Sequence, residues 1–66
     1  MAKNVHVKFV SRWAAAHFSV THQVYQECIV ATDHDSEAQY ATDDINFSSL
    51  LSDLYVYAEI LDIWEE

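Results

Sequence analysis

Carboxylates that lack cationic neighbours are the side chains of this sequence best suited to a chemical role. Between Thr32 and Asp53 the chain has no lysine or arginine, and it carries six acids there: Asp33, Asp35, Glu37, Asp43, Asp44 and Asp53. Carboxylates two positions apart on a strand lie about 6.6 Å apart, and those three or four positions apart on a helix lie about 5–6 Å apart. Successive phosphates of a DNA strand are separated by roughly 6–7 Å. The acids could therefore imitate a run of phosphates, or they could form an ordinary solvated surface, and the sequence leaves both interpretations open.

The distribution of charge restricts the class of partner. The net charge is −8 at pH 7, and the three strong cations, Lys3, Lys8 and Arg12, precede all eleven acids in the chain. Such a chain repels nucleic acid and anionic membranes, so we expect neither as a direct partner. A basic protein surface is the complementary one. The first hypothesis is therefore a small inhibitory protein that occupies the basic nucleic-acid-binding groove of another protein by imitating DNA.

An interface of this kind also needs apolar anchors, because aromatic and apolar side chains supply binding energy that charge alone does not. The candidate anchors are Ile29, Tyr40 and Trp64. The candidate partner-binding carboxylates are Glu27, Asp33, Asp35, Glu37, Asp43 and Asp44.

The length of the chain, 66 residues, predicts a single domain over residues 1–66. A domain of this size buries only about 60% of the surface that its unfolded chain exposes, so its core is thin. Hydrophobic residues make up 52% of the chain, which suggests that pairing two copies would enlarge the core. The second hypothesis is therefore a non-catalytic interaction module that forms a homodimer through a sheet edge or through its aromatic C-terminal segment.

Metal and catalytic chemistry have little support in the sequence. The four histidines and Cys28 show none of the spacings of a zinc site. A phosphate-cradling glycine loop is impossible, because the chain contains no glycine. Cys28 falls on the apolar side of a predicted strand and is interpreted as a small core residue. We therefore expect no enzyme activity, no catalytic or metal-binding residues and no cofactor.

The sequence also indicates a compartment. Cys28 is the only cysteine, so no disulfide can form within the chain. The first ten residues alternate between polar and apolar instead of forming the continuous apolar run of a signal peptide, and no segment approaches membrane-spanning length. The expected location is the cytoplasm.

The elements must be inferred from periodicity, since the chain has neither glycine nor proline. Alternation from Asn4 to Trp13 predicts a strand whose inward residues are Val5, Val7, Phe9 and Trp13. An alternative makes residues 11–17 one or two helical turns. Renewed alternation from Phe18 to Thr32 predicts a second strand that pairs with the first as an antiparallel hairpin.

The second half of the chain is predicted as a helix followed by a strand. Residues 33–45 have a capping residue and apolar residues at helical spacing, and residues 46–53 would form a connection. In the last segment the β-branched and aromatic residues favour a strand. The expected fold class is therefore α+β, a small antiparallel sheet with one helix packed on it in the order β-β-α-β. The alternative places a helix at the C-terminal end, because Leu50, Leu54, Tyr57, Leu61 and Trp64 follow a helical stripe.

Size, charge and layout together resemble the small acidic proteins that phages make against nucleic-acid enzymes of their hosts, several of which imitate DNA. Anti-CRISPR proteins and inhibitors of uracil-DNA glycosylase belong to this group. The stretch QECIV, Gln26 to Val30, is similar to the Gln-Glu-Ser-Ile-Leu stretch of one uracil-DNA glycosylase inhibitor family. In that family the Glu-Ser-Ile edge strand enters the DNA-binding groove. The resemblance implies that Glu27, Cys28 and Ile29 contact the partner, and that the protein acts in the host cytoplasm on a CRISPR-Cas effector or on uracil-DNA glycosylase.

Overall fold

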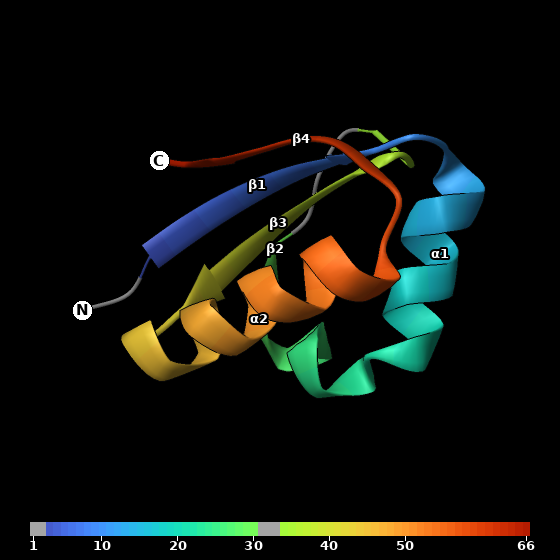
Figure 1. Ribbon diagram of the computed structural model, residues 1–66. Helices are drawn as coiled ribbons and strands as arrows, with labels where there is room; N and C mark the ends of the chain where they lie inside the picture. The colour runs from blue at the N-terminus through green and yellow to red at the C-terminus, as the bar shows by residue number, and fades with distance from the viewer. Residues whose placement is uncertain (1–2, 31–33) are drawn as a thin grey trace.

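The computed structural model describes residues 3–30 and 34–66. Its elements follow in the order β1 (Lys3–Phe9), α1 (Arg12–Thr21), the 3₁₀-helix η1 (Gln23–Cys28), β2 (Ile29–Val30), β3 (Glu37–Thr42), α2 (Asp44–Tyr57) and β4 (Ile60–Glu65). The strands form one antiparallel sheet in the order β2-β3-β1-β4, with β3 and β1 in the middle (Figure 1). If η1 is counted with α1, the element order β-α-β-β-α-β is that of the ferredoxin-like motif.

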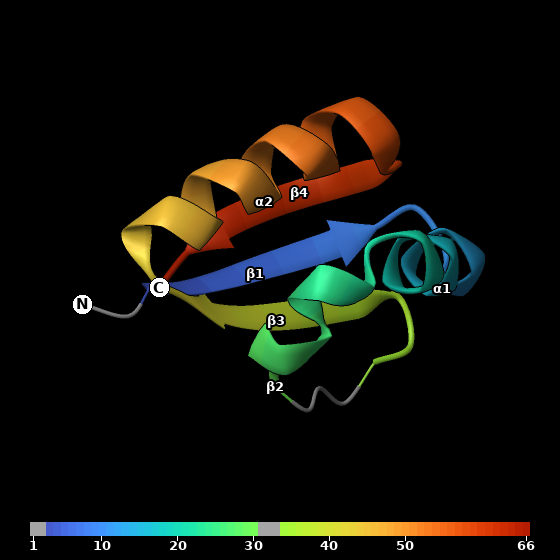
Figure 2. The same ribbon diagram turned by 90° about the horizontal axis from the view of Figure 1, so that it is seen from below.

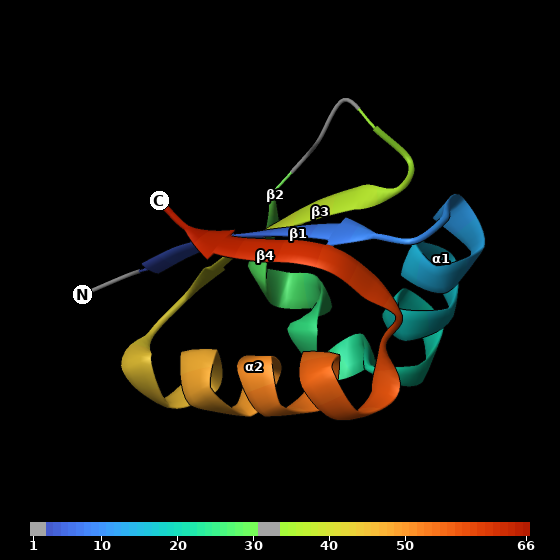
Figure 3. The same cartoon turned by 45° about the horizontal axis from the view of Figure 1, so that its top comes forward.

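The helices lie on one face of the sheet, and no described helix covers the other face. Figure 3 shows α1, η1 and α2 together beneath the strands, and Figure 2 looks at the sheet from the side that carries them. Val5, Val7 and Phe9 of β1 alternate toward the helices, and each is 1% exposed. The other buried hydrophobic residues of the core are Phe18, Tyr25, Tyr40, Leu50 and Leu54. The core therefore fills a single layer between the sheet and its helices.

The expected fold class, α+β with a small antiparallel sheet, is confirmed, although two α-helices and η1 are present instead of one helix. The inward alternation of Val5, Val7 and Phe9 is also confirmed. The first strand nevertheless ends at Phe9, because Ser11 starts a helix there by accepting a hydrogen bond from the Ala14 backbone N at 3.1 Å. The alternative of helical turns was therefore the better interpretation of residues 11–17. Trp13 consequently leaves the inward row and is 70% exposed.

The predicted second strand, Phe18 to Thr32, is wrong over most of its length. Residues 18–21 complete α1, residues 23–28 form η1, and Ile29 and Val30 are the only described residues of this stretch that enter the sheet, as β2. Ala31 and Thr32 lie outside the described residues. Phe18 and Tyr25 are both buried, and their rings stack with centroids 6.2 Å apart. Their separation of seven residues suits two helical turns, whereas on a strand it would place the two rings on opposite faces. The predicted hairpin is wrong too, since β1 pairs with β3 and β4.

The predicted helix over residues 33–45 is wrong for residues 37–42, and only its last two residues are helical among those that the structure describes. Residues 37–42 form β3, in which Tyr40 and Thr42 are buried while Gln39 and Ala41 point to the other face. Pairing with β1 along six residues overrides the weak helical preference of this stretch. A helix does follow, but it begins at Asp44, near the end of the predicted helix, and it covers residues 46–53, which were expected to be a connection.

The last segment contains both of the structures that were weighed for it. α2 ends at Tyr57 and buries Leu50 and Leu54, the first part of the predicted helical stripe. Leu61 and Trp64, the last part of that stripe, lie on β4. The predicted C-terminal strand is therefore confirmed for residues 60–65. It forms an edge of the sheet and pairs with the central strand β1.

Candidate partner-binding surfaces

The predicted carboxylates do not form one continuous row. Asp33 lies outside the described residues. Asp35 and Glu37 stand at the start of β3, and Asp43 and Asp44 stand just beyond its end. A strand of six residues rises roughly 17–20 Å, so the two pairs are at opposite ends of the sheet. The acids that fall within the predicted helix over residues 33–45 are therefore separated by the tertiary structure.

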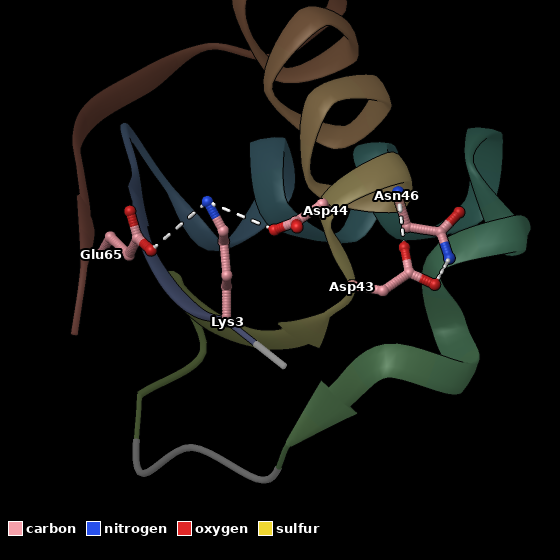
Figure 4. A network of polar contacts seen from close by, with 5 residues as sticks. All are labelled: Lys3, Asp43, Asp44, Asn46 and Glu65. Carbon is pink, nitrogen blue, oxygen red and sulfur yellow. Dashed lines mark hydrogen bonds and ion pairs between the residues drawn. The ribbon is translucent and has the colours of Figure 1, made fainter. Parts of the chain in front are cut away.

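Asp43 and Asp44 have structural partners at the start of α2. The Asp43 Oδ1 atom accepts a hydrogen bond from the Asn46 backbone N at 2.8 Å, which caps the helix, and Oδ2 accepts from the Asn46 side chain at 3.3 Å. Asp44 lies 3.5 Å from the Lys3 ammonium, which is also 3.9 Å from Glu65 (Figure 4). Both acids are nevertheless exposed, and their negative charge also suits the positive end of the helix.

Tyr40 cannot be a docking anchor in the folded protein, which corrects the sequence-based assignment. It is 2% exposed and lies among the core residues of the sheet. Burial, and to a smaller extent the neighbouring Cys28, raises the pKa of Tyr40 to about 12. The alternation of β3 turns this ring toward the helices, because residues on one strand point to opposite faces in turn.

The stretch Glu27 to Ile29 does not form the edge strand that the resemblance implied. Glu27 and Cys28 belong to η1, and only Ile29 lies on the edge strand β2. Glu27 is exposed, but Cys28 is half-buried and packs against the core. This local geometry differs from that of an extended Glu-Ser-Ile segment. The structure therefore does not support assigning the groove contacts of that inhibitor family to Glu27, Cys28 and Ile29.

The open face of the sheet gathers residues that the sequence did not bring together. The register places His6 of β1 opposite both Gln39 of β3 and Trp64 of β4, and Val30 of β2 opposite Gln39. Residues directly opposite one another project to the same face. The rings of His6 and Trp64 are stacked, with centroids 5.2 Å apart and planes inclined by 3°. A row of four side chains thus crosses the face from one edge to the other.

Carboxylates border this row on both sides. Lys8 lies opposite Glu37 and Asp62 on the same face. The C-terminal Glu66 reaches the other side, where its Oε2 atom lies 2.8 Å from the His6 Nε2 atom. We call the set His6, Lys8, Glu37, Gln39, Asp62, Trp64 and Glu66 the open-face cluster. It has three carboxylates and one lysine, besides the titratable His6.

Trp64 is therefore the one predicted anchor that the open face presents, with 43% of its surface accessible. Among the predicted carboxylates that the structure describes, Glu37 is the one that the register places on this face, two strands from Trp64, and it also lies 3.6 Å from His34. His6, Asp62 and Glu66 were missed as binding candidates. The alternation of the first strand indicated that His6 points away from the core. It did not indicate which strands lie beside β1, and therefore not which residues neighbour His6.

A concavity lies between α1 and β3. Its volume is about 450 Å³, and its lining includes Arg12, Ala15, Ala16, Asp35 and Tyr40. Both signs of charge line it, so it does not select one class of charged ligand. Within residues 3–30 and 34–66, no group of three or more metal-ligating side chains is placed to hold a metal ion. None of the helices in the described ranges has the length and apolar character needed to span a membrane.

Comparison with known proteins returned no matching family model, no matching curated sequence and no matching solved structure.

Proposed function

We propose that this chain is a small acidic inhibitory protein that binds the basic nucleic-acid-binding groove of another protein and blocks it by imitating DNA. The observation that supports this function is the number of carboxylates that stay in solvent. Eight acids are exposed among the described residues: Glu27, Asp35, Asp43, Asp44, Glu59, Asp62, Glu65 and Glu66. Only three lysine and arginine side chains are available to balance them.

Several of these acids are not within ion-pair distance of any described lysine or arginine. Within the described ranges, Lys3 is the only lysine or arginine that approaches a carboxylate within 4.0 Å, and it approaches Asp44 and Glu65. Glu27, Glu59 and Asp62 have no such neighbour. Unbalanced surface charge creates a field that steers an oppositely charged partner and accelerates association. The interaction proposed here is therefore fast and weakened by salt.

The proposed targets are enzymes whose grooves bind nucleic acid, with a CRISPR-Cas effector and uracil-DNA glycosylase as the first candidates. The protein would act in the cytoplasm of a host cell if it is encoded by a phage. It would contact no nucleic acid itself. One property of the fold supports a binding function over catalysis: the core is a single thin layer between the sheet and its helices, which leaves little room for an enclosed active site.

The test compares how strongly the unmodified protein and a charge-neutralised, correctly folded variant inhibit both candidate enzymes. Glu27→Gln, Asp35→Asn, Glu59→Gln and Asp62→Asn together remove four charges from positions that neither cap a helix nor pair with Lys3. The matched control exchanges Asp and Glu at the same four positions and keeps every charge. Circular dichroism and thermal unfolding verify that both variants fold.

We expect the unmodified protein and the charge-retaining control to inhibit at low salt and the neutralised variant to inhibit at least tenfold more weakly, a loss of about 1.4 kcal/mol or more. Inhibition should also fade near 1 M salt, where the Debye length is about 3 Å. Equal inhibition by the neutralised variant would refute the proposal. If neither candidate enzyme is inhibited, proteins that salt elutes from the immobilised chain are identified and assayed in the same way.

An alternative function is an interaction module that forms a homodimer. Exposed apolar side chains on the outer side of α2 favour it, since Ile45 is 80% exposed and Val56 is 68% exposed. β4 is also an edge strand and could pair with a second copy. Sedimentation equilibrium in low and high salt discriminates the two functions. A dimer that persists in high salt supports the alternative, whereas a monomer under both conditions removes it.

A further inference from the structure

We propose that the open-face cluster is the surface that receives the basic partner, and that Trp64, Asp62 and Glu66 form a site for an arginine side chain of that partner. This inference rests on the proposed function and names the part of the molecule that performs it. Of the contacts predicted over residues 27–44, Glu37 alone belongs to the open-face cluster.

The open face is accessible because α1, η1 and α2 all lie on the opposite side (Figure 3). β1 and β3 give it a rigid centre, since each is paired on both sides. Trp64 stands on the edge strand β4, so a partner can reach it from above the sheet and from its side. A binding site on a paired strand needs little ordering when the partner arrives, which lowers the entropic cost of binding.

Trp64 presents one ring face to a partner. The stacked His6 ring covers the other face at a centroid distance of 5.2 Å, and 43% of the residue remains accessible. The hydrogen-bonding contact between His6 and Glu66 at 2.8 Å holds this stack in place. A guanidinium group stacks well on the face of tryptophan, because it is planar, cationic and weakly hydrated.

Two carboxylates flank that ring, each with an oxygen left for a partner. Asp62 and Glu66 stand two positions before and after Trp64, which places them about 7 Å away on the same face. Asp62 uses Oδ1 to accept from the Ile63 backbone N at 2.9 Å, and Glu66 uses Oε2 toward His6. Among the described residues, Oδ2 of Asp62 and Oε1 of Glu66 have no hydrogen-bond partner. They can accept hydrogen bonds from the N–H groups of a guanidinium fork.

The charge of the face selects a cation over a nucleic acid. In RNA-recognition modules a four-stranded sheet stacks bases on aromatic side chains of its open face. Here the rings of His6 and Trp64 stand among three carboxylates, which would repel the phosphates that accompany a base. Lys8 offsets one of those charges, so the cluster stays negative. An arginine offers both the flat surface for the ring and the charge for the carboxylates.

The experiment measures binding of nona-arginine and nona-lysine peptides to the full chain by titration calorimetry at low salt. The two probes carry equal charge, but only arginine offers a planar fork. We expect nona-arginine to bind more tightly. Trp64→Ala should weaken nona-arginine binding about two- to fivefold, as an exposed cation–π contact of about 0.5–1 kcal/mol predicts, and should weaken nona-lysine binding less.

Trp13→Ala is the matched control, because Trp13 is also exposed but lies on α1 with the Arg12 guanidinium already 4.9 Å from its ring centre. It should leave both affinities unchanged. Glu66→Gln keeps a hydrogen-bonding group beside His6 and should weaken both peptides by removing charge. The indole N–H resonances of the unmodified protein provide a second readout, which does not depend on any substituted variant folding correctly. The Trp64 signal should shift during the arginine titration, and the Trp13 signal should not.

The outcomes separate this inference from the proposed function. If nona-arginine binds but Trp64→Ala has no effect and the Trp64 indole signal does not move, the open face is not the site, and the proposed function stands. If neither peptide binds at low salt, the acidic surface does not recognise cationic partners, and both proposals fail. A larger shift at Trp13 than at Trp64 would place the arginine site on α1 and overturn the inference.

Discussion

Alkaline pH is expected to destabilise this fold through Tyr40. Burial raises the pKa of this tyrosine from 10.0 to about 12. Because the pKa is higher in the folded state, the folded protein holds the phenol proton more tightly than the unfolded chain does. The stabilising contribution is therefore complete below the unfolded pKa of about 10, and it is lost as the pH rises through about 12.

The magnitude follows from the size of the shift. A difference of about two pKa units corresponds to about 2.7 kcal/mol once both states are ionised, and about 1.4 kcal/mol of it is already lost near pH 11. Tyr40 is 2% exposed, so solvent does little to reduce this effect. A chain of this length has a free energy of unfolding of roughly 3–10 kcal/mol. The loss is therefore large enough to measure by urea denaturation.

Tyr40→Phe keeps the ring in the core and removes the ionisable proton. Between about pH 9 and pH 11 the free energy of unfolding of this variant should fall by about 1.4 kcal/mol less than that of the unmodified protein. Tyr55→Phe is the control, since Tyr55 is 66% exposed, and it should behave like the unmodified protein. Tyr25 contributes in the same direction in all three proteins, because burial, followed by its hydrogen bond to Asp53, raises its pKa to about 12. Identical pH dependence in all three proteins would refute the reasoning.

Three further predictions concern stability and are checked by urea denaturation near neutral pH. Asp43→Ala removes the cap of α2 and should lower the free energy of unfolding by about 1 kcal/mol, whereas Asp35→Ala should not; equal effects would contradict the capping role. Leu54→Ala opens a cavity at a side chain that is fully buried and should cost about 3 kcal/mol. Leu61→Ala, at a β4 residue that is 63% exposed, should cost under about 0.5 kcal/mol, and a comparable loss at both sites would show that α2 does not pack as described. Lys3→Met should cost less than about 1 kcal/mol, because the partner Asp44 is 75% exposed; a larger loss would mean that the ion pair is sheltered from solvent.

Local patterns in the sequence were sufficient for three features of this protein. Period-two alternation identified the strand at residues 4–9 and its buried side, because Val5, Val7 and Phe9 could reach the core only together. β-branched and aromatic residues identified the C-terminal strand. Composition alone determined the excess of negative charge, which depends on no contact. The helical stripe through Leu50 and Leu54 was also visible, but its end was not, because Leu61 and Trp64 continue the helical spacing on a strand.

The tertiary structure decided the elements between those features and the arrangement of the candidate site. Residues 37–42 have no strong preference of their own, and they become a strand because pairing with β1 and burial of Tyr40 stabilise them there. Residues 18–28 became helical because Phe18 and Tyr25 could then bury their rings together under the sheet. The stack of His6 on Trp64 joins residues 58 positions apart, at opposite ends of the sequence. No local pattern carries that information, since strand order and register arise from long-range pairing, and they alone bring the aromatic ring and its carboxylates to one face.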